Sequence, residues 1–305
     1  MDLKSILSGL EGLKVKGSLD VEVNEIRNSS NLVQKGDMFV AIDGFDTDGH
    51  QYIGEAIQKG AKVIMAQADK ITKEMVKELP ENVTFILAPD TRHAVSICAC
   101  NFYKNPSRKL KLIGITGTKG KTTTTYMVKS ILENAGYKVG LIGTIEAIIG
   151  DKVIPAKNTT PESYVIQEYF HEMAEAGCDC VVMEVSSQGL MLHRTQGFVF
   201  DFGIFTNIEP DHIGPNEHKD FDHYLSCKAM LLKQCRVGIV NRDDEHFDRI
   251  IEGHTCTLET YGFSKEADLR AEDARLIGGK GYLGISYQLK GLMDFPVEID
   301  IPGKF

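Results

Sequence analysis

The sequence lacks the marks of a disulfide-stabilised or zinc-ribbon protein. Its seven cysteines include no C-x-x-C pair, and an odd number of cysteines cannot form a closed set of disulfides within one chain. Cys98, Cys178 and Cys180 lie in apolar runs, where free cysteine behaves as a small hydrophobic residue. We therefore expect a reducing, cytosolic environment.

Long apolar runs and an excess of positive charge are also missing. The segment from Met1 to Leu7 lacks the apolar core of a signal peptide, and no stretch approaches the roughly 20 apolar residues of a membrane span. The chain has 34 Lys and Arg against 43 Asp and Glu, a formal net charge of −9. This charge argues against a partner such as nucleic acid or an anionic membrane. We expect a soluble cytoplasmic protein, and a monomer.

What is present indicates two α/β domains, because 305 residues exceed one ordinary core. We place the first at 1–107 and the second at 108–305, with the boundary after Asn105-Pro106-Ser107. In the first, the pattern predicts strands at 37–42, 62–66 and 83–88, and helices at 50–60 and, capped by Thr91, to about Tyr103.

The second domain repeats strand–helix units. Strands are expected at 112–115, 138–142, 180–183, 201–205 and 237–240, and helices at 122–135, 161–176 and 224–232. Apolar strands that alternate with helices of this length predict a doubly wound, mainly parallel sheet. After about Thr257 the helical pattern ends, and short alternating runs around 278–281 predict an antiparallel extension.

Gly117-Thr-Lys-Gly-Lys-Thr122 has the form of a phosphate-binding loop, since it follows a strand and opens a helix. Glycines allow a tight turn whose N–H groups point at phosphate oxygens, and the helix N-terminus adds its dipole. Lys121 would reach the β- and γ-phosphates and the Thr122 hydroxyl would hold Mg²⁺. The plainer alternative is a lysine-bearing turn before a surface helix.

The wider sequence resembles the Mur ligase family and the related folylpolyglutamate synthetases. The resemblance rests on Ile115–Thr124 and on further motifs in the family's order and spacing: Pro106, Asn158-Thr-Thr-Pro161, Met183-Glu-Val-Ser-Ser187, Thr206-Asn207, Asp211-His212 and Asn241-Arg-Asp-Asp244. It implies an ATP-dependent ligase of peptidoglycan precursor synthesis. The members most similar add the third amino acid, diaminopimelate or lysine, to UDP-N-acetylmuramoyl-dipeptide through an acyl phosphate.

The resemblance also implies the site residues. ATP would bind to the loop residues Thr116, Gly117, Thr118, Lys119, Gly120, Lys121, Thr122 and Thr123 and to Asn241 and Asp244; Mg²⁺ to Thr122, Glu184, His212 and Lys228; and the muramoyl substrate to Ser30, His50, Asn158, Thr159, Thr160, Ser186 and Arg194. Lys121, Lys228 and His212 would be catalytic. The family's matching lysine is carbamylated, which requires burial to lower the pKa of Lys228.

Taken alone, several of these residues have ordinary explanations. Glu184 ends a buried strand, where it could ligate Mg²⁺ or cap a neighbouring helix. Thr159 and Thr160 precede Pro161 and resemble an N-cap. His212 could be a structural hydrogen-bonding residue, and Lys228 could be a solvated residue of an amphipathic helix.

The resemblance implies a further domain after Phe305, so we expect the 305-residue chain to bind its ligands weakly and to form little or no amide bond. Three other functions stay open. The chain could be a binding-only module for muramoyl nucleotides or ATP, a ligase of the folylpolyglutamate-synthetase type, or a phosphate-loop NTPase with an unrelated partner.

Overall fold

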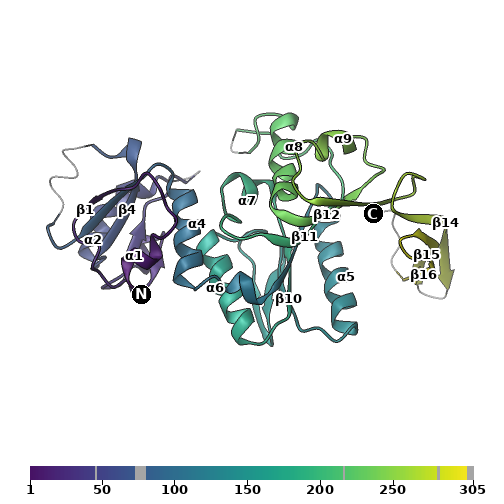
Figure 1. The fold of residues 1–305 in the computed structure, drawn as a ribbon, viewed down its shortest axis with the longest axis horizontal. Coiled ribbons are helices and arrows are strands. Elements are labelled where there is room, and N and C mark those ends of the chain that lie inside the picture. Colours follow the sequence, from purple (N-terminus) through teal and green to yellow (C-terminus); the bar gives the residue numbers. More distant parts are fainter. Residues whose placement is uncertain (45–46, 73–79, 216, 280–281, 301–305) are drawn as a thin grey trace. The chain divides into compact units, whose positions relative to one another are not determined.

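The computed structural model describes residues 1–44, 47–72, 80–215, 217–279 and 282–300 (Figure 1). The chain forms two compact units that are not continuous in sequence. Unit 1 comprises Met1–Lys109, Pro161–Glu175 and Met191–Phe198, and unit 2 comprises the remainder. The first crossing therefore lies at Lys109/Leu110, and two later segments, from within the predicted second domain, belong to unit 1.

Unit 1 is built on a five-stranded sheet. The strand order is β1 (Lys14–Lys16), β5 (Thr84–Ala88), β4 (Val63–Gln67), β3 (Met38–Val40) and β2 (Ile26–Arg27), all parallel except β1. Its helices are α1 (Leu3–Ile6), α2 (Ile53–Gln58), α4 (Thr91–Phe102) and α6 (Ser163–Glu175). Short 3₁₀ turns add η1 (Ser30–Leu32), η2 (Gly49–Tyr52), η3 (Ala68–Lys70) and η4 (Pro106–Lys109).

Strand β3 is apolar throughout because the side chains on both of its faces are buried. Met38 and Val40 belong to one buried cluster, which includes Val95 of α4, whereas Phe39 belongs to the other, which includes Ile53 of α2. Successive side chains of a strand point to opposite faces, so helices must cover both faces of this sheet. The cap predicted at Thr91 is wrong by one residue, because the Asp90 carboxylate accepts the Arg92 and His93 N–H groups.

Unit 2 holds an eleven-stranded sheet that is parallel at its centre and antiparallel at both edges. The central order is β7 (Val139–Ile142), β10 (Cys180–Glu184), β6 (Lys111–Thr116), β11 (Phe200–Phe205), β12 (Cys235–Asn241) and β13 (Thr257–Gly262). One edge continues into β14 (Leu269–Gly279), β15 (Tyr282–Gly291) and β16 (Phe295–Ile299), and the other into β8 (Glu146–Ile149) and β9 (Lys152–Pro155).

The helices of unit 2 are α5 (Lys121–Asn134), α7 (Ser187–Met191), α8 (Phe221–Ala229), the 3₁₀ turn η5 (Met230–Lys233) and α9 (Phe247–Ile250). Figure 1 shows α5 running beside the parallel strands. Its Val128 and Leu132 pack on the buried cluster that contains Ile113 and Ile115 of β6. The side chains on that face of β6 therefore pack against α5, the helix that follows the phosphate loop.

Three glycines stand side by side across the sheet: Gly114 of β6 pairs with Gly203 of β11, which pairs with Gly238 of β12. A Cβ added at Gly114 would lie 3.1 Å from Leu231, and one at Gly238 would lie 2.8 Å from Leu232. The missing side chains therefore let η5 dock close to the backbone of the sheet. Because η5 follows α8 directly, this row of glycines also fixes the C-terminal end of α8.

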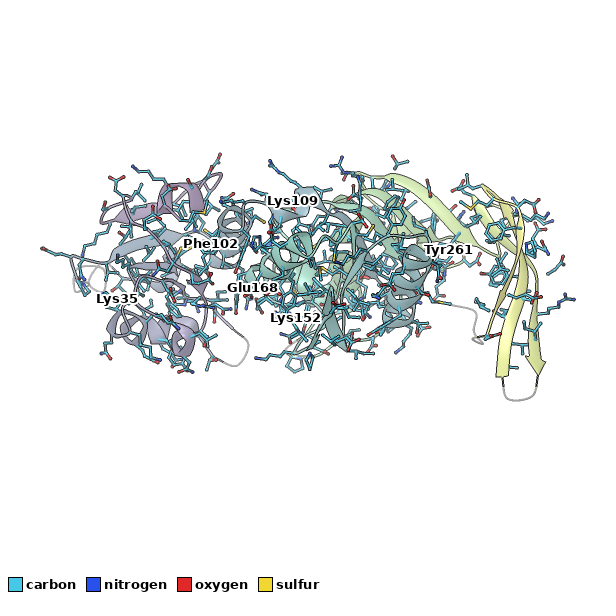
Figure 2. All side chains as sticks on the ribbon, turned by 90° about the horizontal axis from the view of Figure 1, so that it is seen from below. Lys35, Phe102, Lys109, Lys152, Glu168 and Tyr261 are labelled. Atoms are coloured by element: carbon cyan, nitrogen blue, oxygen red, sulfur yellow. The ribbon has the colours of Figure 1, made fainter. Side chains whose placement is uncertain are left out.

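The predicted α/β class and mainly parallel sheet with an antiparallel extension are confirmed. Figure 2 shows Tyr261, on β13, where the long antiparallel strands leave the parallel sheet. The hairpin β8–β9 was not predicted. Residues 280–281 and 301–305 lie outside the described part of the chain. In the described part, no helix is long and apolar enough to cross a membrane.

Candidate active site

The loop between β6 and α5 has the backbone that its glycines predict. Gly117 has a φ of +145° and Gly120 a φ of +81°, and such angles strain residues that carry a Cβ. Gly117 is also tightly enclosed, since an added Cβ would lie 2.0 Å from Thr206 Oγ1. Lys121 and Thr122 then begin α5, so the loop leads into a helix N-terminus as a phosphate site requires.

Thr206 and Asn207, which follow β11, hold the loop in place. The Asn207 side chain accepts the Lys119 N–H at 2.9 Å, and the Thr206 hydroxyl donates to the Lys119 carbonyl at 2.8 Å. Both residues belong to a motif seen in the sequence, yet neither was assigned to the site. Because β11 is the parallel neighbour of β6, its carboxyl end meets the phosphate loop at the same edge of the sheet.

Two lysines reach the same loop. Lys121 Nζ donates to the Gly117 and Thr118 carbonyls at 2.9 and 3.1 Å, and burial lowers the pKa of Lys121. Lys228, on α8, is 2% exposed and donates to the Gly117 carbonyl at 2.8 Å. Burial first, and then the charge of Lys121, holds the pKa of Lys228 well below its usual range. Lys228 is therefore not the solvated surface residue of the alternative interpretation.

Glu184 ends β10 and is fully buried. Its Oε2 accepts hydrogen bonds from the Thr122 and Thr144 hydroxyls, both at 3.0 Å, and its Oε1 accepts the Thr144 N–H at 2.9 Å. A Cβ on Gly143 would lie 2.5 Å from Oε1, so the glycine makes room for the carboxylate. These bonds do not cap a helix, since none uses a backbone amide of a helix N-terminus.

The carboxylate of Glu184 and the hydroxyl of Thr122 form a donor set that suits Mg²⁺, which prefers oxygen ligands and keeps several waters. Thr144 was not among the site residues predicted from the sequence. Its signal was its position just after the strand predicted at 138–142, at the same edge of the sheet as the phosphate loop.

The helix expected to begin at Pro161 begins at Ser163, so Thr160 does not stand directly before its first residue. The Thr160 hydroxyl donates to the Glu184 carbonyl and accepts the Ser186 N–H, both at 2.9 Å. The Thr159 hydroxyl lies 3.1 Å from the Thr144 hydroxyl, to which it can donate because the Thr144 proton is used toward Glu184. The Ser186 hydroxyl accepts the Gly189 N–H at 3.0 Å. Thr159, Thr160 and Ser186 therefore gather at the Glu184 end of β10, and Asn158 precedes them on the surface.

His212 lies on the surface with a positive φ of +54°. Its Nδ1 is 2.9 Å from Glu217 Oε1, and its ring centroid is 5.9 Å from that of Tyr224. The Tyr224 hydroxyl is in turn 3.1 Å from Thr118 Oγ1 in the phosphate loop. His212 thus reaches the loop through Tyr224, and its role as a metal ligand stays a prediction.

Asn241 and Asp244 join the ends of neighbouring strands. Asn241 Nδ2 donates to the Thr206 carbonyl at 3.0 Å, and Asp244 Oδ2 accepts the Ile208 N–H at 2.8 Å. Both bonds steady the segment that braces the phosphate loop. Contact with a nucleotide base stays a prediction for these two residues.

Unit 1 contains a separate cavity of about 400 Å³. It is lined by Asn28, Ser29, Ser30, Asn31, Ile42, Gly44, Thr47, Gly49, Tyr52, Glu55, Arg92 and Glu162. Ser30 lies in this wall, and its hydroxyl donates to Glu55 Oε2 at 3.1 Å. His50 is not in the wall: its Nε2 accepts the Gln67 N–H at 2.9 Å, which leaves Nδ1 to donate to Asp48. These contacts hold the His50 ring between Asp48 and Gln67, and its role in substrate binding stays a prediction.

Glu162 joins two arginines beside this cavity. Arg194 Nη2 is 2.6 Å from Glu162 Oε1, and Arg92 Nη1 is 3.9 Å from Glu162 Oε2. Burial, together with the charge of Arg194, lowers the pKa of Arg92. Of these three residues, only Arg194 was predicted from the sequence. Arg92 and Glu162 gave no motif, because three separate segments of the chain supply this group. A guanidinium pair near a polar cavity is suited to phosphate or carboxylate groups.

Comparison with known proteins gives consistent results. The model of the Mur ligase middle domain matches residues 115–305, and that of the Mur ligase family catalytic domain matches 22–103. UDP-N-acetylmuramoyl-L-alanyl-D-glutamate--2,6-diaminopimelate ligase of Clostridium tetani is 43% identical over 305 residues, and an enzyme of the same name from Clostridium acetobutylicum is also 43% identical. The match covers 100% of this chain but 61% of each relative.

Solved structures agree on the fold. A structure of UDP-N-acetylmuramoyl-L-alanyl-D-glutamate--2,6-diaminopimelate ligase superposes with a TM-score of 0.82 at 21% identity, covering 99% of this chain and 60% of that chain. Folylpolyglutamate synthase of Mycobacterium tuberculosis, complexed with ADP and AMPPCP, gives 0.51 at 16% identity, covering 67% of this chain and 52% of that one. At these identities the likeness establishes the fold alone.

Proposed function

The chain belongs to the Mur ligase family, and from that membership we propose that it carries the nucleotide- and substrate-binding part of an ATP-dependent ligase of peptidoglycan precursor synthesis. The 43% identity to relatives named for diaminopimelate supports UDP-N-acetylmuramoyl-L-alanyl-D-glutamate as substrate and diaminopimelate as the amino acid added. The chain spans 61% of the length of these relatives, so the ligation itself is proposed for the whole protein.

One observation carries the proposal: a fully buried carboxylate, Glu184, is held against the Thr122 hydroxyl where a phosphate loop opens α5. In a lysine-bearing surface turn, nothing would offset the free-energy cost of burying a carboxylate beside the helix. A phosphate loop does offset it, because the Glu184 carboxylate and the Thr122 hydroxyl would hold the Mg²⁺ that accompanies a nucleoside triphosphate. When bound, Mg²⁺ would neutralise charge that develops on the transferred phosphoryl group.

The chain's own residues have distinct roles in this proposal. The N–H groups at the start of α5, together with the Lys121 side chain, bind the phosphates and stabilise negative charge on them. Thr122 and Glu184 would hold the metal, with His212 and Lys228 as further ligands. Lys228 is nearly inaccessible and already abuts the loop carbonyl of Gly117, which suits a lysine that must be neutral to react with CO₂. Carbamylation would convert that lysine into an anion.

The chemistry then follows the order implied by the family. The terminal carboxylate of the muramoyl dipeptide attacks the γ-phosphorus of ATP, which gives an acyl phosphate and ADP. The amine of the amino acid attacks the acyl carbon, and the tetrahedral intermediate expels phosphate as the amide forms. Thr159, Thr160 and Ser186 lie beside Glu184, where they would position the carboxylate that reacts.

For unit 1 we propose the uridine-diphosphate end of the substrate as the occupant of the polar cavity. Ser30 lines this cavity. The guanidinium groups of Arg92 and Arg194, which now pair with Glu162, could instead donate hydrogen bonds to a diphosphate or a carboxylate. The division of labour between a substrate-binding domain at 1–107 and an ATP-binding domain at 108–305 is part of this proposal. A cytoplasmic location and a monomeric state stay predictions.

The test is calorimetric titration of the chain with UDP-N-acetylmuramoyl-L-Ala-D-Glu, with and without Mg-ATP. We expect binding that weakens in Ser30→Ala and in Arg194→Ala, whereas the exposed control Arg236→Ala binds like the parent. Equal binding by all four proteins would contradict the substrate site, and an absence of Mg-ATP binding by the folded chain would contradict the nucleotide site. Phosphate release from ATP without amide formation would indicate a ligase domain that hydrolyses ATP, whereas a binding-only module would release no phosphate.

A further inference from the structure

A second group of potential metal ligands lies on α8, away from the oxygen ligands described above. His223 and Cys227 are four residues apart, which puts them on one face of the helix, and His218 precedes the helix. One ligand atom from each of the three side chains lies within 4.8 Å of the other two. His218 Nδ1 is 3.3 Å from His223 Nδ1, and Cys227 Sγ is 3.6 Å from His223 Nε2.

The His218 ring is oriented as a metal-binding imidazole would be. It is fully buried, and its Nε2 is 2.8 Å from the hydroxyl of Ser187. That contact occupies the outer nitrogen and directs Nδ1 toward His223, in the way that second-sphere partners usually orient ligating histidines.

The backbone around the group is also fixed. Asp220 caps α8 and its Oδ1 accepts the His223 N–H at 2.7 Å, which holds the first turn of the helix. Tyr224 packs its ring 5.2 Å from that of His218. Cys227 is buried on the next turn. Because His223 gives one nitrogen to one ion, binding would shift its ring within a group whose donor atoms already lie within 4.8 Å of one another.

The donor chemistry selects the metal. Two imidazoles and one thiolate are ligands for Zn²⁺ and its transition-metal neighbours, whereas Mg²⁺ and Ca²⁺ prefer oxygen. We propose that His218, His223 and Cys227 form a binding site for Zn²⁺, with a fourth position left for water, separate from the magnesium site. Binding would displace the thiol proton of Cys227 and tie the segment before α8 to the helix.

The site has a direct connection to the phosphate loop. Cys227 is followed by Lys228, whose Nζ donates to the Gly117 carbonyl, and Ser187 follows Ser186 after β10. A metal held by Cys227 would therefore restrict the turn of α8 that carries Lys228. The proposal itself concerns metal binding and does not depend on the ligase function.

Co²⁺ is the probe for the test, because cobalt bound to a thiolate in a tetrahedral site gives thiolate-to-metal charge transfer and intense visible bands. The metal-free 305-residue chain is titrated with Co²⁺ and then with Zn²⁺. We expect one equivalent to produce these bands, Zn²⁺ to abolish them, and excess Mg²⁺ to leave them unchanged. Absence of the charge-transfer band in the parent chain would overturn the proposal.

Variants locate the site. Cys227→Ser should lose the charge-transfer band, and His223→Ala should weaken Co²⁺ and Zn²⁺ binding by at least about tenfold. The controls are Cys256→Ser and His254→Ala, a thiol and an imidazole of the same unit outside the group, which should bind like the parent. Circular dichroism establishes that each variant is folded. A folded Cys227→Ser chain that keeps the band would equally overturn the proposal.

Discussion

Lys121 and Lys228 donate to one acceptor, the carbonyl oxygen of Gly117, at 2.9 and 2.8 Å. The two side chains come from different helices, α5 and α8, and converge on the first glycine of the phosphate loop. Two ammonium groups around a single carbonyl would repel each other, and, after burial, the charge of Lys121 is accordingly one of the causes that lower the pKa of Lys228. The arrangement favours an anion at the loop, and triphosphate is the anion that the loop backbone suits.

Replacing Lys121 by Met tests this directly. We expect the affinity for Mg-ATP to fall by about 10- to 100-fold, because a charge-assisted hydrogen bond contributes about 1.5–3 kcal/mol. Folding should be intact, since Met keeps the aliphatic part of the side chain. Calorimetry with Mg-ATP measures the change, and Lys109→Met, at an exposed lysine, is the control. Unchanged affinity in Lys121→Met would exclude this lysine from the nucleotide site.

Gly117 and Gly120 allow a matched comparison, because both have positive φ but only one is enclosed. At Gly120 an added Cβ meets nothing closer than 4.0 Å, so Ala there should cost about 1 kcal/mol of backbone strain. At Gly117 the Cβ would clash with Thr206 Oγ1, which should add about 1–3 kcal/mol and displace the loop.

Chemical denaturation measures the two free energies of unfolding, and Mg-ATP titration reports the state of the loop. We expect Gly117→Ala to be the less stable variant and to bind nucleotide more weakly than Gly120→Ala. Equal stability of the two variants would show that the contact with Thr206 does not set the shape of the loop.

The sequence was sufficient for the features that depend on local pattern. The phosphate loop was recognised because its glycines and Lys121 follow one another between a strand and a helix. Features that are assembled from distant segments of the chain could not be predicted in this way. Arg92 and Glu162 come together from α4 and the segment before α6, and no spacing in the sequence relates them.

Thr160 shows how a tertiary contact overrides a local signal. Thr followed by Pro is typical of a helix start, yet its hydroxyl bonds the backbone on either side of Val185, at Glu184 and Ser186. Those two backbone groups need hydrogen-bond partners, and the Thr160 hydroxyl serves both. Likewise, Thr144 contacts Glu184 because β7, which Thr144 follows, is the parallel neighbour of β10.

Cysteine reactivity should separate buried from accessible thiols. Burial raises the pKa values of Cys98 and Cys100 to about 12, so at about pH 8 only roughly one molecule in ten thousand carries either thiolate. Cys256 is half-buried. A pulse of iodoacetamide followed by peptide mass spectrometry should therefore label Cys256 first. Cys98 and Cys100 should stay unlabelled in the same pulse, because their thiolates are scarce and enclosed.

In denaturant, Cys98 and Cys100 should react as ordinary thiols, and Cys256→Ser should lose the fast native reaction. Rapid native labelling of Cys98 would mean that the core of unit 1 opens readily, against the complete burial of that side chain.

Replacing Glu184 by Gln separates charge from shape at the proposed metal site. The amide has the size of the carboxylate, and the Thr122 and Thr144 hydroxyls can reorient to accept from it, so the stability loss should be about 1–2 kcal/mol. The charge that attracts Mg²⁺ is lost, however. Nucleotide binding should therefore lose most of its enhancement by Mg²⁺ while the binding measured without the metal stays close to that of the parent. The matched control is Glu146→Gln, whose carboxylate accepts from the Tyr126 hydroxyl at 2.8 Å and lies outside the Thr122–Thr144 group. If Mg²⁺ strengthens ATP binding equally in Glu184→Gln and in the parent, the buried carboxylate serves the structure of the loop and the metal lies elsewhere.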